Sequence, residues 1–271
     1  MKIIKINESQ KKRLFEAYRE GFSFETLSIL GGDAFSDWRN WDEQYNYCVK
    51  WLGEPNGCGS SRCVFTLSDN IILKLAVSDA GIEQNKLEYK TYNRYKSPLL
   101  ARVYDADENF TYLVCENAVP AEDIDFEKII GIPMGSYWQQ NSRQVKKYGS
   151  KGGDCDIGFN KYFDNLRDYI EEYKGVTLYD VLSYLEEKYA INDEEDNDEE
   201  ENYEEEFSDA KEIEEVIDNS EWLSMLRDFI KETKISDLCN SVNYGMVNRN
   251  GKPTLVILDY GLNNDIWEKY Y

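Results

Sequence analysis

The chain has 271 residues, 41% of them hydrophobic, and a formal charge of −22 from 31 basic and 53 acidic residues. It is long enough for one or two domains with sizeable cores, but its acidic balance excludes a general nucleic-acid or anionic-membrane binder, since such proteins need a cationic surface. Histidine is absent, which excludes Ser-His-Asp and Cys-His nucleophile systems and zinc sites with histidine ligands.

The N-terminal segment, residues 1–50, is expected to form a helical leader or extension. Asn7 or Ser9 can cap a first helix, and the aromatic residues within 33–52 recur at the spacing of a second amphipathic helix. Two interpretations of the first helix are open: it docks on the body of the protein, or it is a recognition tag. No apolar run approaches the roughly 20 residues of a membrane span, and no secretory hydrophobic segment follows the N-terminus. We therefore expect an unsecreted protein without a membrane partner.

The next region changes its hydrophobic period. Apolar runs at 64–67 and 71–77 flank a polar turn at 68–70, a pattern that predicts a β-hairpin. Lys74 lies inside the second strand. It points either to solvent across an alternating sheet or into a cleft below the preceding glycine-rich loop, where an ammonium group and backbone amides suit a polyphosphate.

A helix is predicted over 81–95, followed by two strands around a turn at 105–109, the second of which ends at Val119–Pro120. Glu88 on this helix and Lys74 on the preceding strand can pair across the face of the sheet. Such a pair positions a phosphate-binding lysine.

Residues 121–160 are rich in loop-forming glycine and proline and are expected to be irregular. Two helical segments follow, the first ending near Gly175. The acidic run at about 192–209 is typical of a disordered, solvated loop, with a divalent-ion or basic-partner site as the alternative. A further helix is predicted over 221–235.

The end of the chain predicts a polar loop, a short strand at 246–247, a turn at 248–252 and a buried strand that presents Asp259. Gly261 permits a sharp change of backbone direction after it. A carboxylate at the end of a strand suits a hard cation such as Mg2+, and Asn243 can supply a second oxygen ligand.

The six cysteines contain no CxxC pair. We expect them to be reduced, mostly core-filling thiols of a cytosolic-type protein, with a functional cysteine as the alternative. They are Cys48, Cys58, Cys63, Cys115, Cys155 and Cys239.

Taken together, residues 50–262 resemble the protein kinase-like fold. "GCGSSR" at 57–62 looks like the phosphate-covering loop, "ILKLA" around Lys74 like the strand of the phosphate lysine, and "ENAV" at 116–119 like the hinge. "LDYG" at 258–261 looks like the metal-binding motif. The resemblance implies an α+β, two-lobe fold with an antiparallel N-lobe over 51–120 and a reduced, mainly helical C-lobe over 121–271.

The resemblance also implies ATP and Mg2+ in a cleft between the lobes. Asp259 and Asn243 would hold the metal, Glu88 would orient Lys74, and Asp237 would be the base that orients an acceptor hydroxyl. The nucleotide would contact Gly57, Gly59, Ser60, Ser61, Lys74, Glu116 and Ala118.

Three departures qualify what the family implies. Asp237 precedes Asn243 by six positions, whereas the family places its catalytic aspartate five before the asparagine. The histidine usual in that loop is missing. Because the chain ends soon after the metal motif, we also expect the peptide-binding platform to be missing. A small-substrate phosphotransferase, an autophosphorylating enzyme and a nonenzymatic descendant stay open.

A second resemblance concerns the leader, "KIIKINESQKKRLFEA". It is similar to short N-terminal sequences on assorted proteins of bacteriophages of gut bacteria, which implies a place in the host cytoplasm or the virion. Two hypotheses follow. One is an ATP-dependent phosphotransferase, and the other is a pseudokinase that acts as a virion-associated or interaction protein.

Overall fold

The computed structural model describes residues 40–135, 175–191 and 210–271. The predicted leader helix, the first of the two helical segments and the acidic run at 192–209 lie outside these residues. The described part contains antiparallel sheets and seven α-helices, which confirms the α+β class. Contacts divide the chain into two units, one with residues up to Pro120 together with Tyr244–Tyr271, and one with Ala121–Asn243. The 244–271 segment, expected in the C-terminal region, thus groups with the first unit.

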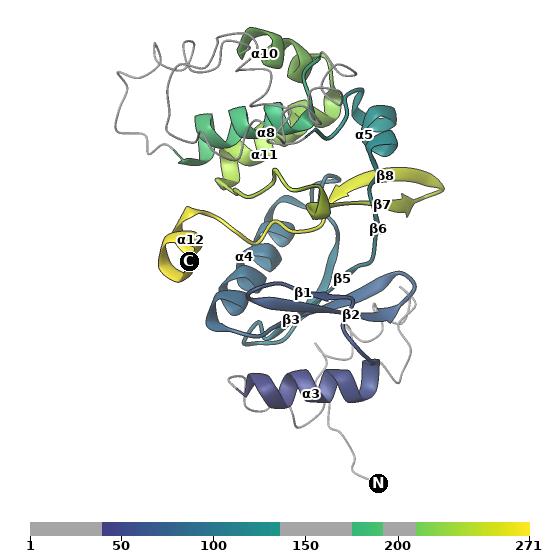
Figure 1. The fold of residues 1–271 in the computed structure, drawn as a ribbon, viewed down its shortest axis with the longest axis vertical. Coiled ribbons are helices and arrows are strands. Elements are labelled where there is room, and N and C mark those ends of the chain that lie inside the picture. Colours follow the sequence, from purple (N-terminus) through teal and green to yellow (C-terminus); the bar gives the residue numbers. More distant parts are fainter. Residues whose placement is uncertain (1–39, 136–174, 192–209) are drawn as a thin grey trace, which may run out of the picture. The chain divides into compact units, whose positions relative to one another are not determined.

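The first unit is built on a five-stranded antiparallel sheet (Figure 1), with strands in the order β1-β2-β3-β5-β4. The predicted hairpin is present, since β2 pairs with β3 around a turn at residues 69–70. The strands are β1 (Gly57–Cys58), β2 (Arg62–Ser68), β3 (Ile71–Ala76), β4 (Val103–Ala106) and β5 (Tyr112–Glu116).

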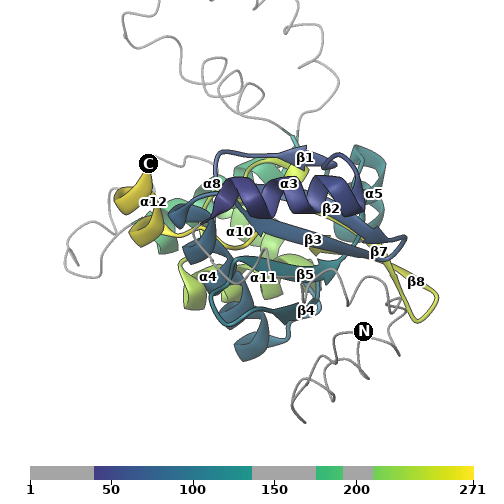
Figure 2. The same cartoon turned by 90° about the horizontal axis from the view of Figure 1, so that it is seen from below.

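Helix α3 (Trp41–Leu52) covers one face of this sheet, and α4 (Asp79–Tyr95) lies against the other (Figures 1 and 2). Because side chains alternate along a strand, Phe65 and Leu73 point toward Cys48 of α3, and all three are fully buried. Lys74 is the next residue after Leu73 and therefore points toward α4. The alternation thus separates an apolar face from a face that carries charge.

A three-stranded antiparallel sheet completes the first unit, in the order β6 (Val119–Pro120), β7 (Tyr244–Arg249) and β8 (Lys252–Ile257). The prediction that one strand runs on to Val119–Pro120 is wrong: β5 ends at Glu116, and β6 pairs with β7 instead. The predicted buried strand before Asp259 is confirmed, because Leu255, Val256 and Ile257 are fully buried. Ile257 also bridges Leu100 in parallel, and α12 (Asn264–Tyr270) packs against α4.

The second unit is helical in its described residues. It contains α5 (Asp123–Ile130), α8 (Leu178–Glu186) with its π-helical continuation (Glu187–Ile191), α10 (Ala210–Asp218), α11 (Glu221–Thr233) and a 3-10 turn (Ser241–Asn243). The core contains fully buried leucines of α8 and α11. The expectation of irregular structure at 121–135 is wrong for α5, whose capping box of Glu122 and Asp125 starts a helix that ends before Gly131.

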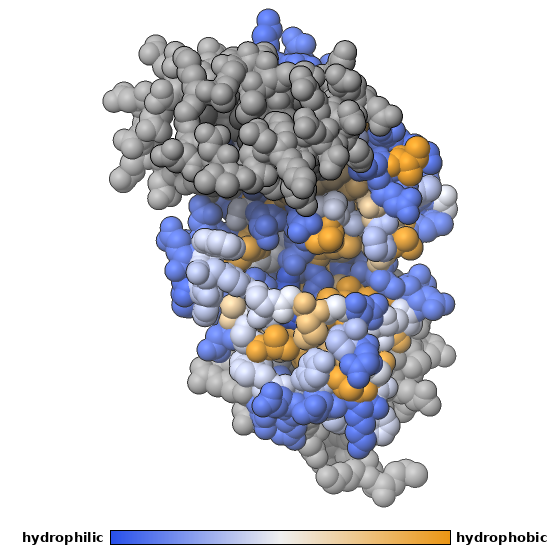
Figure 3. Space-filling view, viewed as in Figure 1, coloured by the Kyte–Doolittle hydropathy of each residue, from blue (hydrophilic) through white to orange (hydrophobic). Residues whose placement is uncertain are grey.

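Among the described helices, none combines the length and the apolar character that a membrane span requires. A few large apolar side chains reach the surface, among them Trp51, Val119 and Trp267, each more than half exposed. On the face drawn in Figure 3, hydrophobic residues are interspersed with hydrophilic ones. Apolar residues scattered in this way are ordinary on protein surfaces.

Candidate functional site

The predicted pair of Lys74 and Glu88 is present and buried. Lys74 is 6% exposed, and its Nζ lies 2.5 Å from Oε1 of Glu88, which is fully buried on α4. The interpretation of Lys74 as a solvent-facing strand residue is therefore wrong. The same ammonium group donates a hydrogen bond of 2.5 Å to the carbonyl oxygen of Leu258. Lys74 thus joins the central strand and α4 to the segment that follows β8.

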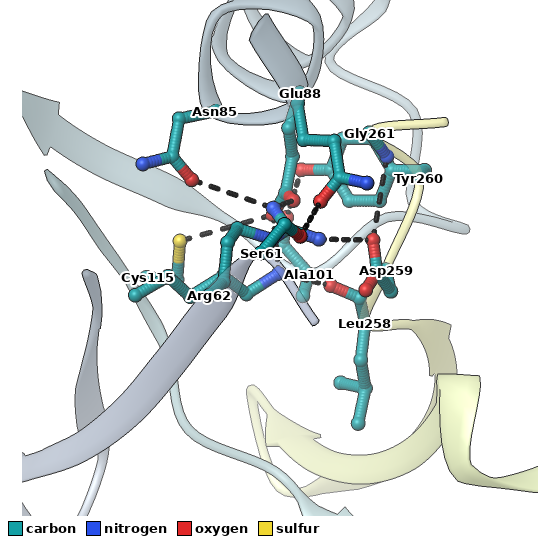
Figure 4. Close-up of polar contacts among 12 residues, drawn as sticks. Ser61, Arg62, Asn85, Glu88, Ala101, Cys115, Leu258, Asp259, Tyr260 and Gly261 are labelled. Atoms are coloured by element: carbon teal, nitrogen blue, oxygen red, sulfur yellow. Dashed lines mark hydrogen bonds and ion pairs between the residues drawn. The ribbon is translucent and has the colours of Figure 1, made fainter. Parts of the chain in front are cut away.

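A second cation, Arg62, shares Glu88 with Lys74. Figure 4 shows Arg62 beside Glu88 and Asp259. Its Nη1 donates to Oε2 of Glu88 at 2.8 Å and to Oδ1 of Asn85 at 3.4 Å. Its Nη2 donates to Oδ1 of Asp259. Burial by itself lowers the pKa of Arg62, but the charges of Asp259 and Glu88 outweigh it and raise the pKa above its ordinary value. The guanidinium group is therefore a fixed positive charge between two carboxylates.

Asp259 follows β8, as the sequence predicted, but its partner in the structure is Arg62. Burial raises the pKa of Asp259, while the nearby charges of Arg62 and Lys74 lower it more strongly, to about 2. Its side chain remains 46% exposed, so solvent screens part of this effect. Behind it, a Cβ at Gly261 would lie 2.6 Å from the carbonyl oxygen of Gln84, so glycine permits the close approach of this segment to α4.

Both backbone and side-chain hydrogen bonds hold the glycine-rich loop, and within it the N–H of Gly59 donates to the carbonyl oxygen of Arg62 at 2.8 Å. A Cβ would meet nothing within 4 Å at Gly57, and only the Arg62 carbonyl oxygen, at 3.9 Å, at Gly59. Ser61 is buried and donates to Oε1 of Gln84 at 2.7 Å, so its hydroxyl is turned toward α4. Ser60 is exposed and donates to the hydroxyl of Tyr271 at 3.2 Å. Neither glycine is required here by backbone conformation or by a close contact.

The expectation of reduced cysteines is wrong for Cys58 and Cys63, which form a disulfide. They lie directly opposite each other where β1 pairs with β2, with Cα atoms 4.1 Å apart. The available signal was the placement of these two cysteines, five positions apart, on either side of residues 59–62 of the glycine-rich loop. Cys48 and Cys115 are free and buried, as expected.

Glu116, expected at the hinge, has a structural contact. Its carboxylate accepts from Nη2 of Arg249 at 2.5 Å and from the backbone N–H of Arg102 at 3.1 Å, and the residue is 7% exposed. A Cβ at Gly245 would lie 2.7 Å from Cβ of Ala118, so Ala118 packs closely on β7. The Glu116 side chain therefore connects the two sheets of the first unit.

Asp237 and Asn243 belong to the second unit and lie in contact with each other. The Asn243 amide donates to the backbone carbonyl oxygen of Asp237 at 2.7 Å, and Asp237 has a φ of +62°. Nearby, Glu186 accepts the N–H of Leu238 at 2.7 Å. Burial, followed by the charge of Asp237, raises the pKa of Glu186 to about 7, although these N–H contacts oppose the shift. Joint binding of a metal by Asn243 and Asp259 stays a prediction, since Asp259 is in the other unit.

No family model matches the chain, and no curated protein matches it significantly. The residue that sequence reasoning missed is Arg62. Its signal was the strand alternation: Val64 lies opposite Lys74, so Arg62, two residues before Val64, shares the charged face with Lys74.

The residues as arranged do not fit a magnesium ion at Asp259. Mg2+ requires near-octahedral oxygen ligands, whereas Oδ1 of Asp259 already accepts a hydrogen bond from the cationic Arg62. Lys74 and Arg62 balance Glu88 and Asp259, two positive charges against two negative ones. A divalent ion would place two more positive charges beside Lys74 and Arg62, and this network has no further carboxylate to balance them.

Proposed function

We propose that the chain is a kinase-like protein of the nonenzymatic kind, a pseudokinase that acts through interactions with other macromolecules. One observation carries the proposal: Arg62 pairs with both Glu88 and Asp259. The lysine, the helix glutamate and the strand-end aspartate of the family resemblance therefore form a closed charge network. This network is neutral without a nucleotide or a metal ion.

The arrangement around the network supports the kinase-like part of the proposal. A glycine-containing hairpin precedes a central strand with Lys74, the following helix carries Glu88, and Asp259 follows a strand from the far end of the chain. This is the order that the resemblance implies. The displaced Asp237 supports the nonenzymatic part, because a base must be within hydrogen-bond reach of the acceptor hydroxyl.

A second candidate is the ATP-dependent phosphotransferase. The contact of 2.5 Å between Lys74 and Glu88 favours it, because this ion pair must be in place for catalysis in protein kinases. A phosphotransferase would additionally require Arg62 to release Asp259 so that this carboxylate can bind a metal ion. In either case, action in a virion or in the host cytoplasm stays a prediction from the leader.

Thermal unfolding with ATP, with Mg2+ and with both tests the proposal. A ligand at about 100 times its dissociation constant would add roughly 2.7 kcal/mol of stability. We expect the wild-type protein to show no stabilisation that needs Mg2+ and ATP together, and no transfer of labelled phosphate from ATP. Lys86→Ala removes a surface lysine of α4 that pairs with Glu83, and it controls for the general effect of losing a lysine in comparison with Lys74→Ala on β3.

Opposite results would select the phosphotransferase. The first such result is a stabilisation that requires both ATP and Mg2+. The second is phosphate transfer that is lost in Lys74→Ala and Asp259→Asn and retained in Lys86→Ala. Stabilisation by ATP without Mg2+, and without transfer, is compatible with a pseudokinase that binds nucleotide.

A further inference from the structure

Arg62 occupies the position from which an external cation would neutralise Asp259. Its two terminal nitrogens reach carboxylates that are far apart in the chain, Nη1 to Glu88 and Nη2 to Asp259. Figure 4 shows the guanidinium group between α4 and the segment after β8. A planar guanidinium group with several donors suits such a double contact, whereas the single ammonium group of a lysine does not.

The backbone holds Arg62 firmly in this position. Arg62 lies opposite Ala76 in the pairing of β2 with β3. On one side, the carbonyl oxygen of Ser61 accepts the N–H of Val77 at 2.8 Å. On the other side, Cys63 is linked to Cys58. With its side chain 7% exposed, Arg62 would have to break buried contacts in order to leave.

An arginine and a divalent ion compete for Asp259 because both are cations. The guanidinium group already uses Oδ1, and it would repel a metal ion that used the other oxygen. At a separation of about 4 Å, even at the dielectric constant of water, the repulsion between a single and a double positive charge corresponds to about thirtyfold in affinity. A less polar surrounding makes the factor larger.

We propose that Arg62 is a built-in cation that excludes divalent metal ions from Asp259, and that its removal creates a metal site there. The inference concerns Asp259, the same carboxylate as in the proposed function. It rests on the proposed function, because only a kinase-like protein would use a metal ion at Asp259 to bind ATP. Arg62 is a positioning residue in this proposal, since it acts by determining what Asp259 can bind.

The test is titration of the full chain with Mn2+ alone, followed by electron paramagnetic resonance and with no nucleotide present. Arg62→Met removes the charge and keeps an apolar stem, whereas Arg62→Lys keeps the charge. Arg227→Met is a matched control, because Arg227 also pairs with two carboxylates, those of Glu214 and Asp218, in the second unit. An acidic protein is expected to bind Mn2+ weakly at many carboxylates. Asp259→Asn, introduced into the wild type and into each variant, identifies the sites that depend on Asp259.

We expect Arg62→Met to gain one Mn2+ site, at least about thirtyfold tighter than any Asp259-dependent binding by the wild type. Asp259→Asn should remove this site, and Arg62→Lys and Arg227→Met should lack it. A wild-type site that Asp259→Asn abolishes and that binds Mn2+ as tightly as Arg62→Met does would overturn the inference, and so would unchanged binding by folded Arg62→Met.

The wild-type chain offers a measurement that does not depend on the Arg62 variants. In 15N NMR spectra, the Arg62 guanidinium protons should exchange slowly with water, and Asp259→Asn should accelerate their exchange. Fast exchange in the wild type would overturn the inference. The Mn2+ titration and the NMR measurement use no nucleotide. Their failure can therefore be distinguished from failure of the proposed function, which the ATP experiments test.

Discussion

Replacement of Glu88 by glutamine is the most direct test of the charge network. Glu88 is fully buried, and its two oxygens accept from Lys74 at 2.5 Å and from Arg62 at 2.8 Å. Glu88→Gln preserves the shape of the side chain but removes the negative charge. The glutamine oxygen can still accept from one of the two cations, but the NH2 group in place of the other oxygen cannot accept, and the buried negative charge is lost. The remaining contacts are the carbonyl oxygen of Leu258 for Lys74, and Asp259 with a longer contact to Asn85 for Arg62.

The expected cost follows from leaving a buried charge without its partner. Breaking one buried ion pair in this way costs about 3–5 kcal/mol. For a cooperative unit of roughly 150 residues, each kcal/mol lowers the melting temperature by about 2–4 °C, so we expect a decrease of about 6–20 °C. Urea unfolding followed by circular dichroism measures the free energy, and thermal unfolding measures the shift.

Glu83→Gln is the matched control on the same helix. Glu83 pairs with Lys86 at 3.3 Å, and both side chains are more than one third exposed, so its loss should cost at most about 0.5 kcal/mol. Lys74→Met combined with Glu88→Gln should cost less than the sum of the two single changes, because the two residues contact each other. If Glu88→Gln destabilises the protein no more than Glu83→Gln does, the network does not stabilise the fold as described.

Three further predictions concern other parts of the molecule. Gly81→Ala should destabilise the protein by about 1–3 kcal/mol, because the added Cβ would lie 2.2 Å from the Ser61 carbonyl oxygen, whereas Gly57→Ala should be nearly neutral because nothing lies within 4 Å; equal urea midpoints would contradict this. Reduction of the Cys58–Cys63 disulfide should lower the free energy of unfolding by about 2 kcal/mol, the entropic effect of a short closed loop, and titration that finds all cysteines free in the oxidised protein would refute the crosslink. Because the pKa of Glu186 is raised from 4.5 to about 7 in the folded state, the folded protein holds more protons in this interval and stability should fall as pH rises through it; Glu186→Gln should flatten this dependence, and an unchanged slope would contradict the assignment.

Local patterns in the sequence were sufficient to predict much of the first unit. The alternation at 64–77 predicted the hairpin of β2 and β3, and the apolar run before Asp259 predicted β8. The pairing of Lys74 with Glu88 was also predicted, because both lie on adjacent elements of one βα segment. Helix α5 was missed, since Gly131 and its neighbours dominated the interpretation and the capping box before it was not recognised.

The partners of Arg62 could not be predicted in the same way. Its contacts with Glu88 and Asp259 span 26 and 197 residues of sequence, and the alternation that placed Arg62 on the charged face does not reveal which carboxylates lie there. Glu116 was similarly named as a hinge residue that contacts the nucleotide, and the sequence did not reveal that its side chain pairs with Arg249, 133 residues later.

The sequence by itself determined the α+β class, most of the strands and helices of the first unit, and the delivery of one lysine and two carboxylates to neighbouring elements. These features depend on the period of apolar residues and on turn and cap residues, which act over a few positions. Only the tertiary structure decided that Asp259 pairs with an arginine, because the partner of a buried charge is set by which distant segments pack together. That choice distinguishes a closed network of side chains from a carboxylate ready to bind a metal ion.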